Sequence, residues 1–393
     1  MGHGRIASAA KQPLWAVTIW DKKFNSVAPG KQKSAIKYHY LLAGDLKEKI
    51  VPGGDVKLLT TSETDWWTTE DKVVGLVSEG EIVSIPWGGN PNVQYFKGRF
   101  VTADNRIATS SDKGILDNKF LYYFMLSKRN TIGSFYRGAG LKHPEMSKVL
   151  DMEIPLPSIE VQRSFARCMD NVAKVIAIRK TQLESLSQLV KSRFVEMFGE
   201  PTINSKGWPV ARLSELGELN RGVSKARPRN SPDLLGGPYP LVQTGEVANS
   251  GLYIRHYNAT YSEKGLAQSR LWNSGTLCIT IAANIAQTSI LTFDACFPDS
   301  VVGFVANERT IPVFIHFWFA FFQHILEAQA PQVAQKNINL KILSELNVIE
   351  PPIALQREFA AFVAKVDKLA FATRRRRDLA QQMYRAKIQE FFG

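Results

Sequence analysis

Residues 154–199 read IPLPSIEVQRSFARCMDNVAKVIAIRKTQLESLSQLVKSRFVEMFG, and residues 348–393 read VIEPPIALQREFAAFVAKVDKLAFATRRRRDLAQQMYRAKIQEFFG. The two stretches align without a gap at a constant offset of 194 residues. Identical pairs include Gln162 with Gln356, Phe165 with Phe359 and Gly199 with Gly393. The chain is therefore an internal duplication in which each half ends in the same kind of element.

Both stretches predict long helices that carry a heptad seam. Seam positions follow one another in alternating steps of four and three, the spacing that keeps one stripe of a helix against a partner helix. Prolines precede each helix, and Gly199 followed by Pro201 ends the first one. About forty residues at 1.5 Å each make a rod of roughly 60 Å. The seam residues are Phe165, Met169, Val172, Ile176, Leu183, Leu186, Val190 and Met197 in the first helix, and Phe359, Val363, Val366, Tyr384 and Phe391 in the second.

We interpret the two seams as an antiparallel coiled coil that holds two globular regions apart. Helices on globular surfaces are usually far shorter, and two repeated seams in one chain are natural partners for each other. The alternative is that each helix packs only on its own domain. The expected organisation is a globular region at 1–153, a helix at 154–200, a second globular region at 201–347 and a helix at 348–393.

The two globular regions repeat one order of parts, which predicts a mixed α/β fold with pseudo-twofold symmetry. Strands are indicated by GDVKLLTTS and EGEIVSIP in the first region, and by PYPLVQTGEV and GTLCITIAANIAQTSILTFDACFPDSVVGFV in the second. NKFLYYFMLSKRNTIGSFY and IPVFIHFWFAFFQHILEA read as matching helices. Glycine, asparagine and proline between Pro86 and Gly98 predict a loop there.

Composition indicates a cytosolic protein with a polyanionic partner. The net charge is +13 and the pI is near 9.5, and Lys and Arg that neutralise phosphates gain affinity through counterion release. The sequence has no apolar run of about eighteen residues and no signal-peptide core, so we expect no membrane association. The three cysteines lack metal-ligand spacing.

The sequence contains no recognisable catalytic motif, so we expect binding and no covalent chemistry. A GxxxxGK[ST] phosphate loop is missing, and His143 and His316 are expected to be structural. Arg and Lys can pair with phosphate or guanine, and Asn and Gln with adenine, although ordinary solvated loops have the same composition. The candidate DNA-binding residues are Trp87, Asn90, Asn92, Gln94, Lys97, Arg99, Arg106 and Lys142 in the first half, and Arg221, Lys225, Arg227, Arg229, Asn284, Gln287 and Lys336 in the second.

Almost the whole chain resembles the specificity subunits of Type I restriction-modification systems. The resemblance is carried by IPLPSIEVQRSFA, LVKSRFVEMFGEP and the DACF-containing stretch of the second half, with VKLLTTS and YRGAGLKHPEM in the first. It implies two target-recognition domains that each read half of a split DNA sequence, joined by helices whose length sets the unread spacer. PLWAVTIWDKKF departs from the GWPVARLSEL-like opening, so the two domains are expected to read unrelated half-sites.

The resemblance also implies partners and cofactors. Two methyltransferase subunits would use S-adenosylmethionine to methylate adenine, and restriction subunits would use ATP and Mg²⁺, with no cofactor in this chain. Two alternatives stay open from the residues alone. One is a basic scaffold that docks an acidic protein, and the other is a nucleic-acid-modifying enzyme with an unrecognised active site.

Overall fold

The chain forms two compact units whose boundary falls within two long helices. The computed structural model describes residues 9–21, 35–62, 64–282, 285–329 and 338–393. Unit 1 comprises residues 1–180 and 375–393, and unit 2 comprises residues 181–374. Each unit therefore contains one globular region together with part of both long helices.

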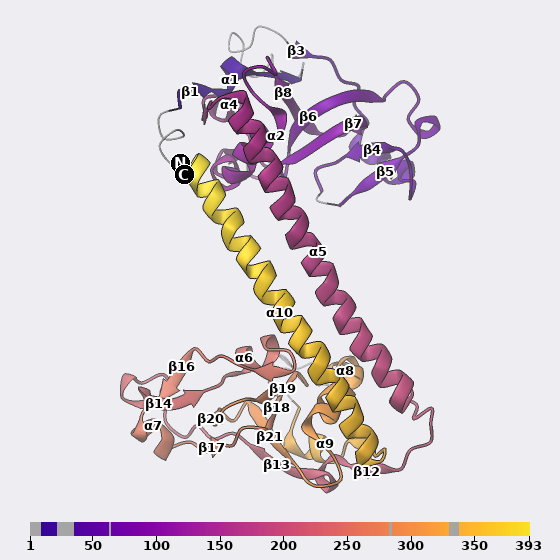
Figure 1. The fold of residues 1–393 in the computed structure, drawn as a ribbon, viewed down its shortest axis with the longest axis vertical. Helices are drawn as coiled ribbons and strands as arrows, with labels where there is room; N and C mark the ends of the chain where they lie inside the picture. The colour runs from indigo at the N-terminus through magenta and orange to yellow at the C-terminus, as the bar shows by residue number, and fades with distance from the viewer. Residues whose placement is uncertain (1–8, 22–34, 63, 283–284, 330–337) are drawn as a thin grey trace. The chain divides into compact units, whose positions relative to one another are not determined.

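The long helices are α5 (Ile159–Phe198) and α10 (Ile353–Phe392), each of 40 residues (Figure 1). Their first and last residues differ by the same offset of 194 that aligns the sequences. Each helix buries or half-buries every seam position predicted for it. Gly199 follows α5 with φ of +81°, a left-handed conformation that glycine adopts without steric cost.

Unit 1 is built on a seven-stranded mixed sheet that α2 (Asn118–Ser127) contacts through its central strand β6 (Figure 1). Unit 1 also contains three short helices: α1 (Leu14–Val17), α3 (Arg129–Ser134) and α4 (Met146–Leu150). In sheet order the strands are β3 (Ala35–Ile36), β2 (Thr18–Asp21), β8 (Asn105–Ser110), β6 (Ser78–Pro86), β7 (Gln94–Thr102), β4 (Val56–Leu59) and β5 (Trp66–Thr68). Two further pairs lie outside the sheet: β1 (Lys11–Pro13) with β11 (Glu153–Pro155), and β9 (Tyr136–Arg137) with β10 (His143–Pro144).

The prediction of a loop between Pro86 and Gly98 is wrong for the second half of that segment. Gln94 begins β7, which pairs antiparallel with β6 so that Gln94 lies opposite Ser84 and Lys97 opposite Glu81. Aromatic and β-branched residues in VQYF favour a strand, and pairing with β6 outweighs the turn-forming residues that precede them. The candidates Gln94, Lys97 and Arg99 therefore stand on a strand.

Unit 2 carries two sheets in place of one. The five-stranded sheet contains, in order, β13 (Gly217–Arg221), β21 (Val301–Ala306), β18 (Leu277–Thr280), β19 (Thr288–Leu291) and β15 (Tyr253–Ile254). The four-stranded sheet contains β16 (Ala259–Tyr261), β14 (Leu235–Leu241), β20 (Ala295–Cys296) and β17 (Leu271–Trp272). Its helices are α6 (Thr244–Asn249), α7 (Glu263–Ala267), α8 (Pro312–Gln329) and α9 (Leu340–Ser344), and β12 (Val210–Arg212) pairs with β22 (Asn347–Ile349).

A buried glutamine fixes the start of α5 in unit 1. Gln162 Oε1 accepts a hydrogen bond from the Asp117 amide at 3.0 Å. Its Nε2 donates to the carbonyl oxygens of Ile115 at 2.8 Å and Pro157 at 2.9 Å. One side chain thus joins the first turn of α5 to the loop that precedes α2, and it satisfies backbone groups that would otherwise be buried unpaired.

The same clamp recurs in unit 2 with every partner shifted by 194 positions. Gln356 Oε1 accepts from the Ile311 amide at 3.3 Å, and Nε2 donates to Arg309 O at 3.1 Å and Pro351 O at 2.9 Å. Unit 2 adds a bond from the Thr310 hydroxyl to Gln356 Oε1 at 3.0 Å. The duplication therefore extends to individual hydrogen bonds.

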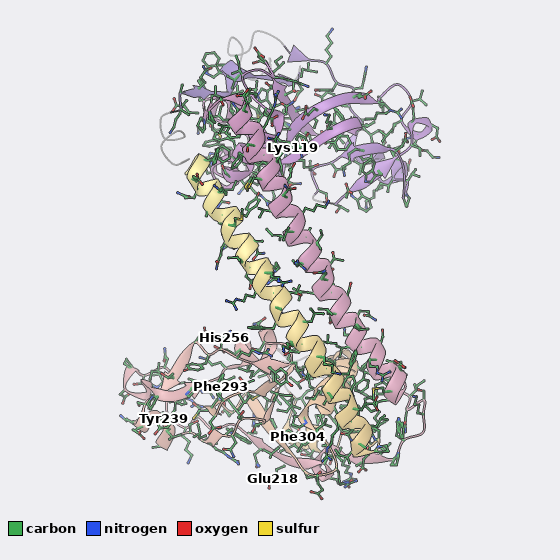
Figure 2. The ribbon with its side chains drawn as sticks, in the orientation of Figure 1. Lys119, Glu218, Tyr239, His256, Phe293 and Phe304 are labelled. Atoms are coloured by element: carbon green, nitrogen blue, oxygen red, sulfur yellow. The ribbon has the colours of Figure 1, made fainter. Side chains whose placement is uncertain are left out.

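Phenylalanine rings hold the two long helices together within unit 1. Phe165 lies 5.6 Å from Phe120 of α2, 4.1 Å from Phe391 and 5.3 Å from Phe392, as distances between ring centroids. An early residue of α5 thus packs on the last residues of α10, so the two helices run in opposite directions there. Figure 2 shows Lys119 of α2 beside α5, where it pairs with Asp170.

Unit 2 repeats this packing from the other ends of the helices. Phe359 of α10 lies 5.4 Å from Phe194 and 5.5 Å from Phe198 of α5, and 5.3 Å from Phe317 of α8, again between ring centroids. Phe359 is fully buried. The two long helices therefore belong to the cores of both units. Within the described residues, none of the helices is long and apolar enough to span a membrane.

Candidate nucleic-acid interface

Arg106 lies inside unit 1 and cannot serve as a surface contact. Its side chain is 5% exposed, and its Nη1 lies 3.4 Å from Oδ1 of the fully buried Asp21. The guanidinium carbon stands 4.0 Å from the centre of the Trp87 ring, a cation–π distance. The prediction that Arg106 contacts DNA is therefore wrong, because its charge is used within the core.

Trp87 is part of the same internal cluster. Its carbonyl oxygen lies 2.7 Å from Nδ1 of His143, and the two rings lie 5.0 Å apart. Its amide donates to Asp104 O at 2.6 Å. Trp87 is half-buried, so its main role is to support the loop. His143 has a structural role in the same cluster.

Arg99 is engaged by two carboxylates on the surface of unit 1. Its guanidinium lies 2.8 Å from Asp55 Oδ2 and also pairs with Glu70. Three predicted candidates remain exposed in this unit: Asn90, Lys97 and Lys142. The amide of Gly89 donates to Lys142 O at 3.3 Å, which brings the segments of Asn90 and Lys142 together.

Asn92 and Gln94 line a cleft of about 380 Å³ in unit 1. Asn92 Nδ2 donates to Ser62 O at 3.2 Å, and Gln94 Nε2 donates to Thr60 O at 2.8 Å. These bonds hold both amide nitrogens in place, and the cleft is also lined by aromatic side chains and by Lys57 and Asp65.

The cleft contains residues that the sequence reasoning missed. Trp67 packs edge-on against Phe96 with centroids 6.1 Å apart, and Lys57 Nζ lies 5.3 Å from the Trp67 ring. Lys57 also pairs with Asp65, and burial lowers the pKa of Lys57. The pair Trp66-Trp67 was a usable signal, because neighbouring residues of a strand point to opposite faces and one of two tryptophans must leave the core.

In unit 2, a short basic loop after β13 is fixed by backbone hydrogen bonds. The amide of Gly222 donates to Val301 O at 2.8 Å, and that of Val223 donates to Phe297 O at 3.1 Å. A Cβ atom at Gly222 would overlap the carbonyl oxygen of Phe297, so only glycine permits this close approach. These bonds anchor the start of the loop to β21 and to the segment that precedes it.

The end of β13 and this loop together present four predicted cations on the surface. Arg229 Nη2 lies 2.6 Å from Asp299 Oδ1, and Arg221 Nε donates to Asp299 O at 3.0 Å. Arg227 donates to carbonyl oxygens of its own loop, Ser224 O at 2.7 Å and Ala226 O at 2.8 Å. These contacts orient the guanidinium groups, and Lys225 is exposed beside them.

Arg229 also borders a cleft of about 300 Å³ in unit 2. Polar residues that the sequence reasoning missed stand around it: Ser224, Asn230, Gln243, Thr244 and Ser300. Their signal in the sequence was weak, because Gln243 and Thr244 lie in a segment predicted as a strand, whereas Thr244 begins α6.

The structure describes one of the three remaining candidates in unit 2. Gln287 is half-buried, and its carbonyl oxygen accepts from the Thr280 amide at 2.9 Å. Asn284 and Lys336 lie outside the described residues. His316 accepts or donates a bond with the Thr288 hydroxyl at 2.9 Å, and burial lowers the pKa of His316 to about 4.

Known proteins identify the duplicated unit. Residues 18–188 and 205–380 each match the Type I restriction modification DNA specificity domain. These two matches account for most of the sequence, so the chain belongs to this family of specificity domains and carries the domain twice.

Individual relatives agree with this family. The chain is 22% identical over 165 residues to the Type I restriction enzyme MjaVIII specificity subunit of Methanocaldococcus jannaschii, covering 42% of this chain and 38% of the relative. It is 21% identical over 266 residues to the putative type I restriction enzyme MjaX specificity subunit of the same organism, covering 64% of this chain and 59% of the relative. The similarity thus spans less than two thirds of either relative.

A solved structure shares the fold. The S subunit of a Type-I restriction-modification system from M. genitalium superposes with a TM-score of 0.66 at 15% identity, over 100% of this chain and 98% of that one. At this identity the likeness concerns the fold alone.

Proposed function

We propose that this chain is the DNA-recognition subunit of a Type I restriction-modification complex, in which each unit reads one half of a bipartite target. The observation that carries the proposal is a helical frame that is repeated down to its hydrogen bonds, while the sheets of the two units differ in number and strand order. A repeated frame with different reading surfaces suits two related tasks on two different sequences. The net charge of +13 fits a polyanionic ligand.

The long helices are the proposed docking sites for partner subunits. Large apolar side chains stand exposed along them, which is unusual for helices that have no further partner. In unit 1 these are Val175, Ile178, Leu379 and Met383, and in unit 2 they are Leu189, Leu369 and Phe371. We propose that methyltransferase subunits cover these residues.

The chemistry would belong to those partners. S-adenosylmethionine would be used by the methyltransferase subunits, and ATP with Mg²⁺ by the restriction subunits, while this chain supplies recognition alone. Lengthening both α5 and α10 by one heptad should change the number of unread base pairs and leave both half-sites intact. Recovery of the original spacing would refute a role of helix length in setting the spacer.

The direct test is to co-express the chain with its methyltransferase partner and map methylated adenines in the host DNA by sequencing. We expect a split motif with an unread gap. Exchanging residues 201–347 for the equivalent region of another family member should replace one half of the motif and keep the other. A stable complex that methylates no motif would favour a scaffolding role instead.

A further inference from the structure

The cleft of unit 2 is lined by both polar and apolar side chains. Arg229, Asn230 and Gln243 are among its polar lining residues. Leu241 and Tyr261, which belong to the buried core of the four-stranded sheet, also line it. A planar ligand with hydrogen-bonding groups along its edge fits such a lining, and the edge of a nucleobase has this character.

Ser224 supplies an independent sign that a ligand completes this cleft. The residue is only 6% exposed, it lines the cleft, and its Oγ atom has no hydrogen-bond partner within the described residues. Buried hydroxyls in folded proteins are almost always paired. An acceptor or donor on a bound base would satisfy this hydroxyl.

The charge of the cleft favours base reading over phosphate binding. Asp299 Oδ1 lies 2.6 Å from Arg229 Nη2, so the positive charge of Arg229 is largely neutralised. A phosphate site gains from excess positive charge, whereas a guanidinium held by a carboxylate is oriented as a hydrogen-bond donor. The loop that carries Arg229 is also tied to β21 through Gly222 and Val301, which keeps the donor in place.

We infer that this cleft receives the major-groove edge of one purine in the half-site that unit 2 reads, an inference that rests on the proposed function. Arg side chains pair with the O6 and N7 atoms of guanine, and Asn and Gln side chains pair with the N6 and N7 atoms of adenine. Arg229, Asn230 and Gln243 thus offer the groups that recognise purines, and Ser224 lines the same cleft.

The test uses the full chain co-expressed with its methyltransferase partner. Asn230→Ala, Gln243→Ala and Ser224→Ala are each compared with Asn249→Ala, a control that removes an exposed amide of α6 outside the cleft. Methylated adenines are mapped by sequencing. We expect at least one cleft variant to lose about 10- to 100-fold in discrimination at a single motif position. The other half-site and the control variant should be unchanged.

The possible outcomes distinguish failure of this inference from failure of the proposed function. If wild-type protein directs a split motif and all three cleft variants keep it unaltered, the cleft does not read a base. A uniform loss of methylation at all sites, with no change of motif, would indicate a phosphate contact and also overturn the inference. If wild-type protein directs no split motif, the proposed function itself fails. Retention of the unit 1 half-site in each variant demonstrates that the complex still assembles.

Discussion

The two units agree where they meet the long helices and differ in their larger sheets. Gln162 and Gln356 make the same three backbone hydrogen bonds, with partners displaced by 194 positions. By contrast, unit 1 has one seven-stranded sheet and unit 2 has sheets of five and four strands. Packing against a long helix constrains side chains closely, because a core tolerates little change of shape. Sheets further from that contact could diverge, and they carry the candidate reading surfaces.

The largest effect that would test this comparison concerns the paired phenylalanines. Phe165→Ala and Phe359→Ala each remove a buried ring from a cluster of aromatic side chains. We expect each to lower the free energy of unfolding by about 3–5 kcal/mol, measured by chemical denaturation. Hydrogen exchange should then show loss of protection in unit 1 for Phe165→Ala and in unit 2 for Phe359→Ala.

A matched control for these variants is Val175→Ala on α5, where the side chain is 41% exposed. It should change stability by no more than about 0.5 kcal/mol. If either phenylalanine variant destabilised both units equally, the division of the helices between two cores would be incorrect.

The glutamine clamp predicts an intermediate effect of equal size in the two units. Gln162→Leu and Gln356→Leu preserve approximate volume but leave buried backbone groups unpaired, at a cost of about 1–3 kcal/mol each. Thermal unfolding of both variants should be compared with Gln382→Leu, which alters an exposed glutamine of α10. If the two substitutions lowered stability by very different amounts, the equivalent hydrogen bonds in the two units would not contribute equally to stability.

The smallest effect distinguishes the units by pH. His316 in unit 2 occupies the position of Tyr122 in unit 1, and burial lowers the pKa of His316 from 6.5 to about 4. Between these values the unfolded chain binds a proton that folded unit 2 excludes, so stability is complete above pH 6.5 and falls as the pH drops toward 4.

His316→Gln should remove this contribution to the pH dependence of stability. We expect the contribution to lower the free energy of unfolding by about 1–2 kcal/mol at pH 5, a modest amount because the side chain is half-buried. The measurement is the melting temperature of both proteins from pH 7 to pH 4.5. Parallel curves for wild type and variant would contradict the assignment. Tyr122 ionises far above this range, because burial raises its pKa from 10.0, so unit 1 offers no equivalent response.

The sequence predicted the parts of the fold that depend on periodic patterns. The heptad seam, the flanking prolines and Gly199 anticipated two long helices, and the alignment at 194 residues anticipated the repeated frame. These features are local or repeated, so a single sequence reveals them. The Gln162 and Gln356 pair was visible in the alignment, but its hydrogen-bonding role required the fold.

The candidate interface was harder to predict because burial depends on distant residues. Arg106 looked like a surface cation, yet its partner Asp21 lies far away in the sequence and reaches it only through the pairing of β2 with β8. Likewise, the strand at Gln94 depends on pairing with β6. Charge and turn composition describe a residue's neighbours along the chain, whereas exposure depends on its neighbours in space.

The inclusion of α10 in the core of unit 1 has a consequence for synthesis on the ribosome. Phe391 and Phe392 pack against Phe165, and Lys128 bonds to the carbonyl oxygen of Phe392. Domains usually fold in the order in which they are translated. Here unit 2 is one continuous segment and can fold while translation continues, whereas unit 1 must wait for residues 375–393. A stop codon that removed residues 375–393 would therefore damage the first unit made and spare the second.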